Sequence, residues 1–339
     1  MPEIHVAFAV DETFLTYCSA ALTSICRHLP GPEEIRFYLL HNGSISETAR
    51  CEFFEKTPCL AGKYARAEFV EMKDRLDISK QVVTSAHITA ETYFRLYLHE
   101  IFPELNKILY LDADVVVMRN IKELFDIDIS NLCLAGVEDL MSHEFMKRLD
   151  LPLTEKYVNG GVLLMNLDNI REINASARVE EILNSPLSQA VTFGDQDLTA
   201  LIFKGRIKYI PLRWNILARP AKEMAERCGI VNGIDLEDML AARSNPYILH
   251  YAGPQKPWDG ASSKEYTCLG QFLRWFKYAS ETGYFTAEFK KIESANRRKL
   301  KVNLIIGQLK LLLDKILLKL KFKDRPRKQG RPRWLNQKG

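Results

Sequence analysis

The sequence predicts an α/β protein with a mostly parallel, mixed sheet and a basic helical C-terminal tail. Two observations predict this fold class. Short apolar runs rich in Val, Ile, Phe and Tyr recur along the chain, and segments with helical periodicity lie between several of them. Strands that alternate with helices favour one sheet with helices on both faces. A chain of 339 residues is long enough to bury the core of one large α/β domain.

Seven apolar runs are interpreted as strands because each is short and rich in β-branched or aromatic residues. In chain order they are IHVAFAV (4–10), IRFYLL (35–40), ARAEFVEM (65–72), KILYLD (107–112), LCLAGVED (132–139), GVLLMNL (161–167) and RIKYIPL (206–212). Segments with the period of a helix are FLTYCSAALTSICRHL (14–29), SETARCEFFEK (46–56), TAETYFRLYLHEIF (89–102) and DQDLTALIFK (195–204). In such sheets, ligands bind beyond the carboxyl ends of the strands.

The cysteines and the first residues indicate a reducing compartment. Seven cysteines are scattered without a C-x-x-C pair, as ordinary small core residues are. The stretch MPEIHVAFAV enters the first predicted strand directly and lacks the basic and apolar regions of a secretory signal. We therefore expect a cytoplasmic protein with reduced thiols.

Charge is distributed unevenly along the chain. Residues 290–339 contain seventeen Lys and Arg and three acidic residues, a net charge of +14. Because the whole chain carries +4, residues 1–289 carry −10. The acidic body argues against general nucleic-acid binding, and the basic end is suited to an anionic partner.

The C-terminal region is expected to form a helical cap at 262–295 and a basic tail at 296–339. Within the tail, 303–322 has apolar residues on one helical face and charged residues on the other. This helix is too short and too charged to span a bilayer, but it suits the surface of an anionic membrane. A polybasic arm ending in an aromatic residue extends the expected membrane contact over 303–334. Packing on the body or on a partner is the alternative.

Two carboxylates follow the fourth predicted strand. The run KILYLDADVVV at 107–117 sets Asp112 and Asp114 among apolar residues, where an unpaired carboxylate costs several kcal/mol. If strand geometry continues through Ala113, both side chains point the same way and form a site for Mg²⁺ or Mn²⁺. Two architectures share this pattern. One is a haloacid-dehalogenase-like phosphatase with a nucleophilic aspartate, and the other is a nucleotide-sugar transferase.

Three later stretches add polar residues beside strands and helices. KYVNGGVLLMNL at 156–167 places an Asn and two glycines before a predicted strand, which lets a ligand approach the backbone closely. TFGDQDLTALIF at 192–203 puts two acids and a glutamine in the first turn of a helix. YILHYAGPQKPW at 247–258 ends a strand with a histidine and continues into a loop with Gly, Lys and Trp, a combination that favours contact with metal and phosphate.

Taken in order, these stretches resemble the family-8 retaining glycosyltransferases. The segments that carry the resemblance are FAVDETF (8–14), YFRLYL (93–98), LYLDADVVV (109–117), YVNGGVLLMNL (157–167), GDQDLTALIF (194–203) and LHYAGPQKPW (249–258). The resemblance extends over roughly residues 4–260. They are most similar to bacterial enzymes that add α-linked glucose or galactose to the lipopolysaccharide core. The resemblance implies a single GT-A-type Rossmann-like domain at 1–261 and counts against the phosphatase.

The resemblance also implies a binding site for a UDP-hexose and a divalent cation. Asp112, Asp114 and His250 would be the protein ligands of Mn²⁺, since a nitrogen ligand fits Mn²⁺ better than Mg²⁺. Lys256 and the backbone of Gly253 would neutralise the diphosphate. The remaining implied contacts are Ala9, Asp11 and Thr13 with uracil and ribose, Ala113 between the metal ligands, and Arg95, Asn159, Gly160, Asp195 and Gln196 with the donor sugar.

The implied reaction retains the configuration at the anomeric carbon. A two-step mechanism needs a carboxylate nucleophile under that carbon, but the matching residue is Gln196, a poor nucleophile. We therefore expect front-face transfer, in which the departing phosphate oxygen accepts the acceptor's proton and Asp195 or Gln196 steadies the cationic sugar. Asp197 is the alternative nucleophile, although one residue along a helix turns it by about 100°.

The expected acceptor is a lipid-linked or free oligosaccharide of the lipopolysaccharide core or a related surface glycan. Its site would include the segments 140–156 and 213–245. The enzyme is expected to lie peripherally on the inner face of the bacterial cytoplasmic membrane. A catalytically silent, membrane-bound glycan-binding protein is the alternative outside enzymology, and the presence of both aspartates, the histidine and the lysine argues against it.

Overall fold

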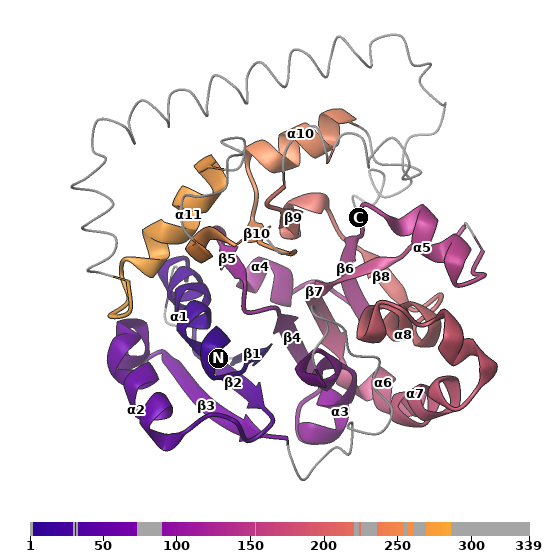
Figure 1. The fold of residues 1–339 in the computed structure, drawn as a ribbon, viewed down its shortest axis with the longest axis horizontal. Helices are drawn as coiled ribbons and strands as arrows, with labels where there is room; N and C mark the ends of the chain where they lie inside the picture. Colours follow the sequence, from indigo (N-terminus) through magenta and orange to yellow (C-terminus); the bar gives the residue numbers. More distant parts are fainter. Residues whose placement is uncertain are drawn as a thin grey trace.

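A mixed seven-stranded sheet forms the centre of the protein (Figure 1). The computed structural model describes residues 3–29, 31, 33–72, 90–152, 154–219, 224, 236–253, 256–259 and 269–285. The strand order is β3-β2-β1-β4-β7-β6-β8. The strands are β1 (Ile4–Ala9), β2 (Ile35–His41), β3 (Ala65–Glu71), β4 (Lys107–Leu111), β6 (Leu134–Glu138), β7 (Val158–Asn166) and β8 (Ile207–Tyr209). Within this sheet of the described residues, only the pairs that β7 makes are antiparallel, which confirms the predicted mostly parallel α/β sheet.

A second, three-stranded sheet stands beside the first and carries the predicted histidine. Its order is β5-β10-β9, with β5 at Val115–Val117, β9 at Ile216–Leu217 and β10 at Ile248–His250. β10 pairs antiparallel with β5 and parallel with β9. The sequence analysis did not predict β5 as a separate strand or β9 at all, because each is too short to show a period of its own.

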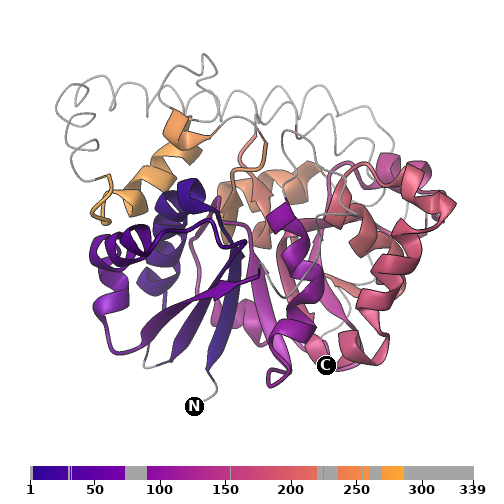
Figure 2. The same ribbon diagram turned by 60° about the horizontal axis from the view of Figure 1, so that its bottom comes forward.

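Helices cover both faces of the central sheet. The α-helices are α1 (Glu12–Arg27), α2 (Glu47–Lys56), α3 (Leu98–Ile101), α4 (Lys122–Phe125), α5 (Ser142–Arg148), α6 (Leu167–Glu172), α7 (Ala175–Leu183), α8 (Gly194–Ile202), α10 (Leu236–Ser244) and α11 (Leu269–Ala279). Short 3₁₀ helices occupy Pro58–Ala61, Ala90–Tyr97, Pro186–Ala190, Leu212–Trp214 and Pro257–Asp259. In Figures 1 and 2, α10 and α11 lie near the second sheet, away from β3.

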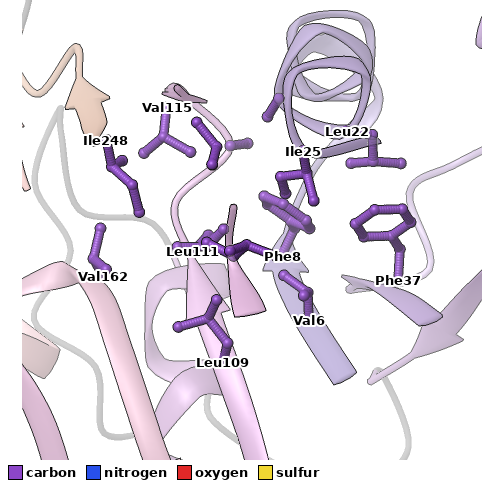
Figure 3. Packing of buried hydrophobic residues seen from close by; sticks show 14 of the residues in the cluster. Val6, Phe8, Leu22, Ile25, Phe37, Leu109, Leu111, Val115, Val162 and Ile248 are labelled. Atoms are coloured by element: carbon purple, nitrogen blue, oxygen red, sulfur yellow. The ribbon is translucent and has the colours of Figure 1, made fainter. Parts of the chain in front are cut away.

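The alternation of side chains along the central strands explains the layers. On β1, Val6 and Phe8 pack with residues of α1 and β2, whereas Ala7 packs on the opposite face with α8 and the 3₁₀ helix at 90–97. Figure 3 shows Phe8 beneath Ile25 of α1. A third apolar cluster joins the second sheet to α10 and α11.

Three sequence-based expectations differ from the observed elements. The segment 107–117 is not one strand, because β4 ends at Leu111 and β5 begins at Val115 in the other sheet. The pair Gly160–Gly161 lies within β7 and not before it, because Val158 pairs with Glu138 across a bulge. The predicted helix at 89–102 is a 3₁₀ helix followed by the single turn of α3.

Part of the predicted C-terminal organisation lies outside the described residues. α11 falls within the expected cap at 262–295. The tail at 296–339, with the amphipathic segment at 303–322, lies outside them.

Candidate active site

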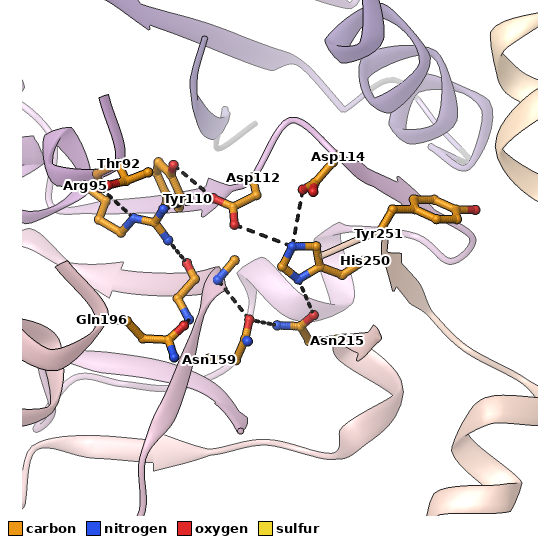
Figure 4. A network of polar contacts seen from close by, with 12 residues as sticks. Thr92, Arg95, Tyr110, Asp112, Asp114, Asn159, Gln196, Asn215, His250 and Tyr251 are labelled. Carbon is orange, nitrogen blue, oxygen red and sulfur yellow. Dashed lines mark hydrogen bonds and ion pairs between the residues drawn. The ribbon is translucent and has the colours of Figure 1, made fainter. Parts of the chain in front are cut away.

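Three side chains from two segments that are far apart in the sequence converge at the carboxyl ends of β4 and β10 (Figure 4). The Nε2 atom of His250 lies 3.5 Å from Oδ2 of Asp112 and 3.2 Å from Oδ1 of Asp114. The candidate ligand atoms of the three residues all lie within 4.8 Å of one another. Two carboxylates and an imidazole nitrogen at this separation fit one divalent cation. The structure thus brings together all three residues predicted as metal ligands.

Backbone hydrogen bonds hold the two aspartates where the sheets meet. The amide of Asp112 donates to the carbonyl of Gly161 on β7 at 3.0 Å, and the carbonyl of Asp114 accepts from Tyr251 at 2.9 Å. Ala113 is a buried turn residue between them. The carboxylates therefore converge because the chain turns from one sheet into the other, not because they alternate along one strand.

Gly161 makes room for two of these side chains. A β-carbon built on Gly161 would lie 2.2 Å from Cε1 of His250 and 2.8 Å from Oδ2 of Asp112. The pair of glycines in the sequence indicated close approach to the backbone. The structure shows that at Gly161 the approaching groups are the candidate metal ligands themselves.

Arg95 links a candidate metal ligand to a candidate catalytic residue. Its guanidinium nitrogens lie 3.0 Å from Oδ1 of Asp112 and 3.0 Å from Oδ2 of Asp195. A third contact is a hydrogen bond to the carbonyl of Gly160, and the guanidinium carbon lies 4.3 Å from the centre of the Tyr110 ring. Burial lowers the pKa of Arg95, but the two aspartates raise this pKa by a larger amount. The pKa of Arg95 therefore lies above its ordinary value. Arg95 is thus a fixed positive charge between the two carboxylates.

Asp195 and Gln196 begin α8 and face the Arg95 region. Asp195 is 5% exposed, and this burial raises its pKa to about 6, with Arg95 opposing the shift and Asp112 adding to it. The side-chain oxygen of Gln196 accepts a hydrogen bond from the amide of Gly160 at 2.9 Å. A β-carbon on Gly160 would lie 2.7 Å from Nη1 of Arg95. Four of the five residues predicted to line the donor sugar, Arg95, Gly160, Asp195 and Gln196, therefore form one connected group.

Asp197 points away from this group, and structural hydrogen bonds occupy its carboxylate. It is completely buried, and its carboxylate accepts from Arg148 at 2.5 Å and from the hydroxyl of Tyr157 at 2.6 Å. Its other oxygen accepts from the amides of Thr192 and Phe193 at 2.8 and 2.7 Å. A carboxylate that already accepts four hydrogen bonds is poorly placed to attack a sugar, which agrees with the preference for Gln196 over Asp197 in the sequence analysis.

Lys256 brings positive charge to the opposite side of the metal-ligand group. Its Nζ lies 2.5 Å from Oδ2 of Asp114 and 2.8 Å from the carbonyl of Tyr251. Burial raises the pKa of Asp114, but His250 and Lys256 outweigh burial and hold this pKa well below its usual range. Gly253 in the same loop has a φ of +97°, and a β-carbon there would meet Nη2 of Arg219 at 2.9 Å. The loop after β10 thus requires a glycine at this position.

The residues expected at the nucleotide lie at the carboxyl end of β1, which neighbours β4 in the sheet. Ala9 is the last residue of β1, and Thr13 is exposed in the first turn of α1. Asp11 is the N-cap of α1, and its carboxylate accepts from the amide of Phe14 at 2.7 Å. Asp11 therefore has a structural role as well as the predicted contact.

Asn159 points away from the donor-sugar residues toward a chain of amides behind His250. Its Nδ2 donates to Asp139 at 2.8 Å, and its Oδ1 accepts from Asn215 at 2.8 Å. Asn215 in turn contacts Nδ1 of His250 at 3.1 Å. The sequence analysis missed Asn215 and Asp139. Both residues stand next to apolar runs in the sequence, which could have indicated them. Many other polar residues do so as well, so this signal is weak.

The raised pKa of Asp195 predicts a pH effect on stability in the metal-free protein. A carboxyl whose pKa is higher in the folded state binds a proton more tightly there, so it stabilises the fold below its unfolded pKa and loses this contribution as pH rises through about 6. Asp195→Asn lacks this titration. We expect wild type to lose about 1 kcal/mol more than Asp195→Asn between pH 5 and pH 7, measured by urea unfolding. Parallel stability curves for the two proteins would contradict this prediction.

Comparison with known proteins agrees with this geometry. The model for glycosyl transferase family 8 matches residues 5–262 of the chain. The chain belongs to glycosyltransferase family 8. Its resemblance to that family, drawn from six segments of the sequence, is thus confirmed, and it is a glycosyltransferase.

Relatives of this family-8 glycosyltransferase align with most of its chain. General stress protein A of Bacillus subtilis is 24% identical over 84% of this chain and 95% of that protein. The lipopolysaccharide 1,3-galactosyltransferase of Salmonella typhimurium is 25% identical over 76% of this chain and 73% of that enzyme. Among solved structures, the galactosyltransferase LgtC in complex with donor and acceptor sugar analogues aligns with a TM-score of 0.65 and 28% identity, over 83% of this chain and 96% of LgtC. The fold is therefore of the predicted GT-A type.

Proposed function

We propose that this glycosyltransferase is a metal-dependent, retaining UDP-hexose transferase that moves glucose or galactose in α linkage to a lipopolysaccharide core or related surface glycan. The observation that carries the proposal is the convergence of Asp112, Asp114 and His250 between Arg95 and Lys256. A relative that is a lipopolysaccharide 1,3-galactosyltransferase supports the choice of hexose and acceptor class.

The proposed donor site would offer two positive charges to a departing diphosphate. A divalent cation held by the two aspartates and the histidine would supply positive charge to the diphosphate oxygens. Lys256 would add a second positive charge, because its ammonium lies within 2.5 Å of Asp114. Both charges favour the departure of UDP.

The proposed sugar site lies on the Arg95 side of the metal ligands. Arg95 holds Asp195 in place by an ion pair, and the amide of Gly160 fixes the side-chain oxygen of Gln196. Asp195 as a carboxylate would steady positive charge that develops on the sugar, and Gln196 would position the anomeric carbon. Since Asp197 is occupied by four donors, we propose front-face transfer, with the departing phosphate oxygen accepting the proton of the acceptor hydroxyl.

The same contacts weaken the phosphatase hypothesis. A phosphatase of the haloacid-dehalogenase type needs an aspartate free to attack phosphorus. Both candidates are already engaged, Asp112 with Arg95 and Tyr110, and Asp114 with Lys256. A catalytically silent glycan-binding protein is less favoured because both aspartates, the histidine and the lysine of the proposed site are present.

The direct test is release of UDP by purified protein from UDP-glucose, UDP-galactose and their N-acetyl forms, with Mn²⁺ or with EDTA. Release from one hexose donor that requires Mn²⁺ would support the proposal and identify the sugar. Metal-dependent release from the N-acetyl donors alone would overturn the hexose assignment. If neither UDP release nor Mn²⁺-dependent UDP binding is observed, the transferase proposal fails.

We also propose that the basic tail at 296–339 holds the enzyme at an anionic membrane that contains the acceptor. Within the described residues, every helix is too short or too polar to cross a bilayer. Attachment through 303–334 would raise the local concentration of a lipid-linked acceptor without changing the active site.

Deletion of residues 296–339 should separate these two roles. We expect the truncated protein to keep full UDP-sugar hydrolysis but to lose about tenfold or more in transfer to acceptor embedded in anionic vesicles. The matched control is transfer to a water-soluble acceptor oligosaccharide, which should not change. Equal transfer by full-length and truncated protein on vesicles would contradict the membrane role.

A further inference from the structure

We infer that Asn215, oriented by Asn159, fixes the tautomer of His250 so that its Nε2 is an unprotonated metal ligand. The inference rests on the proposed metal-dependent function and deepens it, because it concerns residues that do not touch the metal. His250 and Asn215 are 3% and 5% exposed. Their hydrogen bonds therefore compete little with water, and a mismatched pair would be costly.

The orientation of Asn159 is determined by two groups whose hydrogen-bonding roles cannot change. The carboxylate of Asp139 can only accept, and it lies 2.8 Å from Nδ2 of Asn159. The amide of Gly161 can only donate, and it lies 3.1 Å from Oδ1 of Asn159. Asp139 is itself held by the amide of Met141, which donates to its other oxygen at 2.8 Å. Asn159 must therefore present its oxygen, not its nitrogen, toward Asn215.

This orientation is passed on to His250. Because Oδ1 of Asn159 accepts, Asn215 must donate through Nδ2, at 2.8 Å. The remaining atom of the Asn215 amide is its oxygen, which lies 3.1 Å from Nδ1 of His250. Only a protonated Nδ1 can donate to that oxygen. In the neutral imidazole, Nε2 then carries a lone pair directed at Asp112 and Asp114.

The chain of amides matters because the opposite tautomer would otherwise be favoured. Nε2 of His250 lies 3.2 Å from a carboxylate oxygen of Asp114, so without Asn215 a proton on Nε2 would gain a hydrogen bond to that carboxylate. A protonated Nε2 cannot bind a metal. Asn215 is thus a positioning residue that favours metal binding, in the way that outer contacts of metal-bound histidines orient the ring in general.

Three variants separate the hydrogen-bond acceptor from general effects on folding. Asn215→Leu is close in shape but removes the acceptor, whereas Asn215→Asp keeps an oxygen opposite Nδ1 of His250 and replaces the donor to Oδ1 of Asn159 with a second oxygen. The matched control is Asn169→Leu, since Asn169 is a half-buried asparagine whose amide donates to the carbonyls of Ser130 and Leu132. Asn169 follows β7, whose last residue pairs with Lys107 at the start of β4. It therefore lies at the end of these strands opposite the metal ligands.

The first readout is the affinity for Mn²⁺ alone, measured from the electron paramagnetic resonance signal of free Mn²⁺. We expect a loss of about 10- to 100-fold for Asn215→Leu, a smaller loss for Asn215→Asp, and a loss of less than about threefold for Asn169→Leu. Wild-type affinity in Asn215→Leu would overturn the inference.

The second readout needs neither metal nor donor. Nitrogen-15 NMR of the metal-free protein at mildly alkaline pH distinguishes protonated from unprotonated ring nitrogens, and His250→Gln identifies the signals of His250. We expect a protonated Nδ1 in wild type, and a shift toward an unprotonated Nδ1 with a protonated Nε2 in Asn215→Leu. An unprotonated Nδ1 in the wild type would overturn the inference even if the enzyme is active. Absence of UDP release with the expected tautomer would overturn only the proposed function.

Discussion

Replacement of Asp114 by asparagine should lower Mn²⁺-dependent UDP release by more than about a hundredfold, since even residues that only orient a metal ligand contribute 10- to 100-fold. Asp114 is buried, and the pKa of its carboxyl is held well below the usual range by His250 and Lys256 despite burial. Its charge is therefore present at any working pH. Asparagine keeps the shape but removes the charge that a cation and Lys256 both require.

The comparison that gives this result meaning is Asp126→Asn. Asp126 is an exposed aspartate that forms an ion pair with Lys122 on α4, and its neighbours Phe125 and Ile127 contact Lys107 at the start of β4, the end opposite the metal ligands. We expect its UDP release and Mn²⁺ affinity to equal those of wild type. Retention of Mn²⁺-dependent release within tenfold in Asp114→Asn would contradict the assignment of Asp114 as a metal ligand.

Gly161→Ala should damage the site almost as strongly, although it adds only one methyl group. The new β-carbon would lie 2.2 Å from Cε1 of His250, a distance at which one of the two groups must move. His250 is buried, and Asn215 contacts its Nδ1, so the ring cannot turn aside without breaking the tautomer-fixing contact. We expect a loss of about tenfold or more in Mn²⁺ affinity and a decrease of about 1–3 kcal/mol in the free energy of unfolding.

A glycine elsewhere in the chain provides the control for this substitution. Gly62 has a φ of −77°, and a β-carbon there would meet only the carbonyl of Cys59, at an ordinary 3.5 Å. Gly62→Ala should leave Mn²⁺ affinity unchanged and leave stability equal or slightly higher, because alanine restricts the unfolded chain. Titration of Mn²⁺ and urea unfolding on both variants would test this contrast. Wild-type affinity in Gly161→Ala would show that the ring of His250 is not held as described.

The ion pairs of Arg95 connect the two halves of the proposed donor site. One guanidinium contacts a candidate metal ligand and a candidate sugar-binding carboxylate, each at 3.0 Å. A change at Asp112 therefore alters the electrostatic environment of Asp195, because burial, Arg95 and Asp112 together set its pKa of about 6. Effects of substitutions at these positions should not add, because they share one buried cation.

The sequence by itself determined the order of the main strands and helices. Apolar periodicity is local, so it places β1, β2, β3 and β4 and the helices α1, α2 and α8 without knowledge of their partners. It also indicated the two aspartates and the histidine, because charged groups beside apolar strands need partners. The order of the six motif segments then identified the family.

Only the tertiary structure decided how the site is built. The turn between β4 and β5, the separate second sheet and the contacts of Asn159, Asn215 and Gly161 all depend on segments far apart in the chain. Local periodicity carries no information about such pairs, because a strand of two or three residues acquires its conformation from its neighbours. The same holds for His250, whose orientation is fixed by a hydrogen bond to Asn215, the residue before β9, which Asn159 of β7 orients in turn, and not by any property of its own segment.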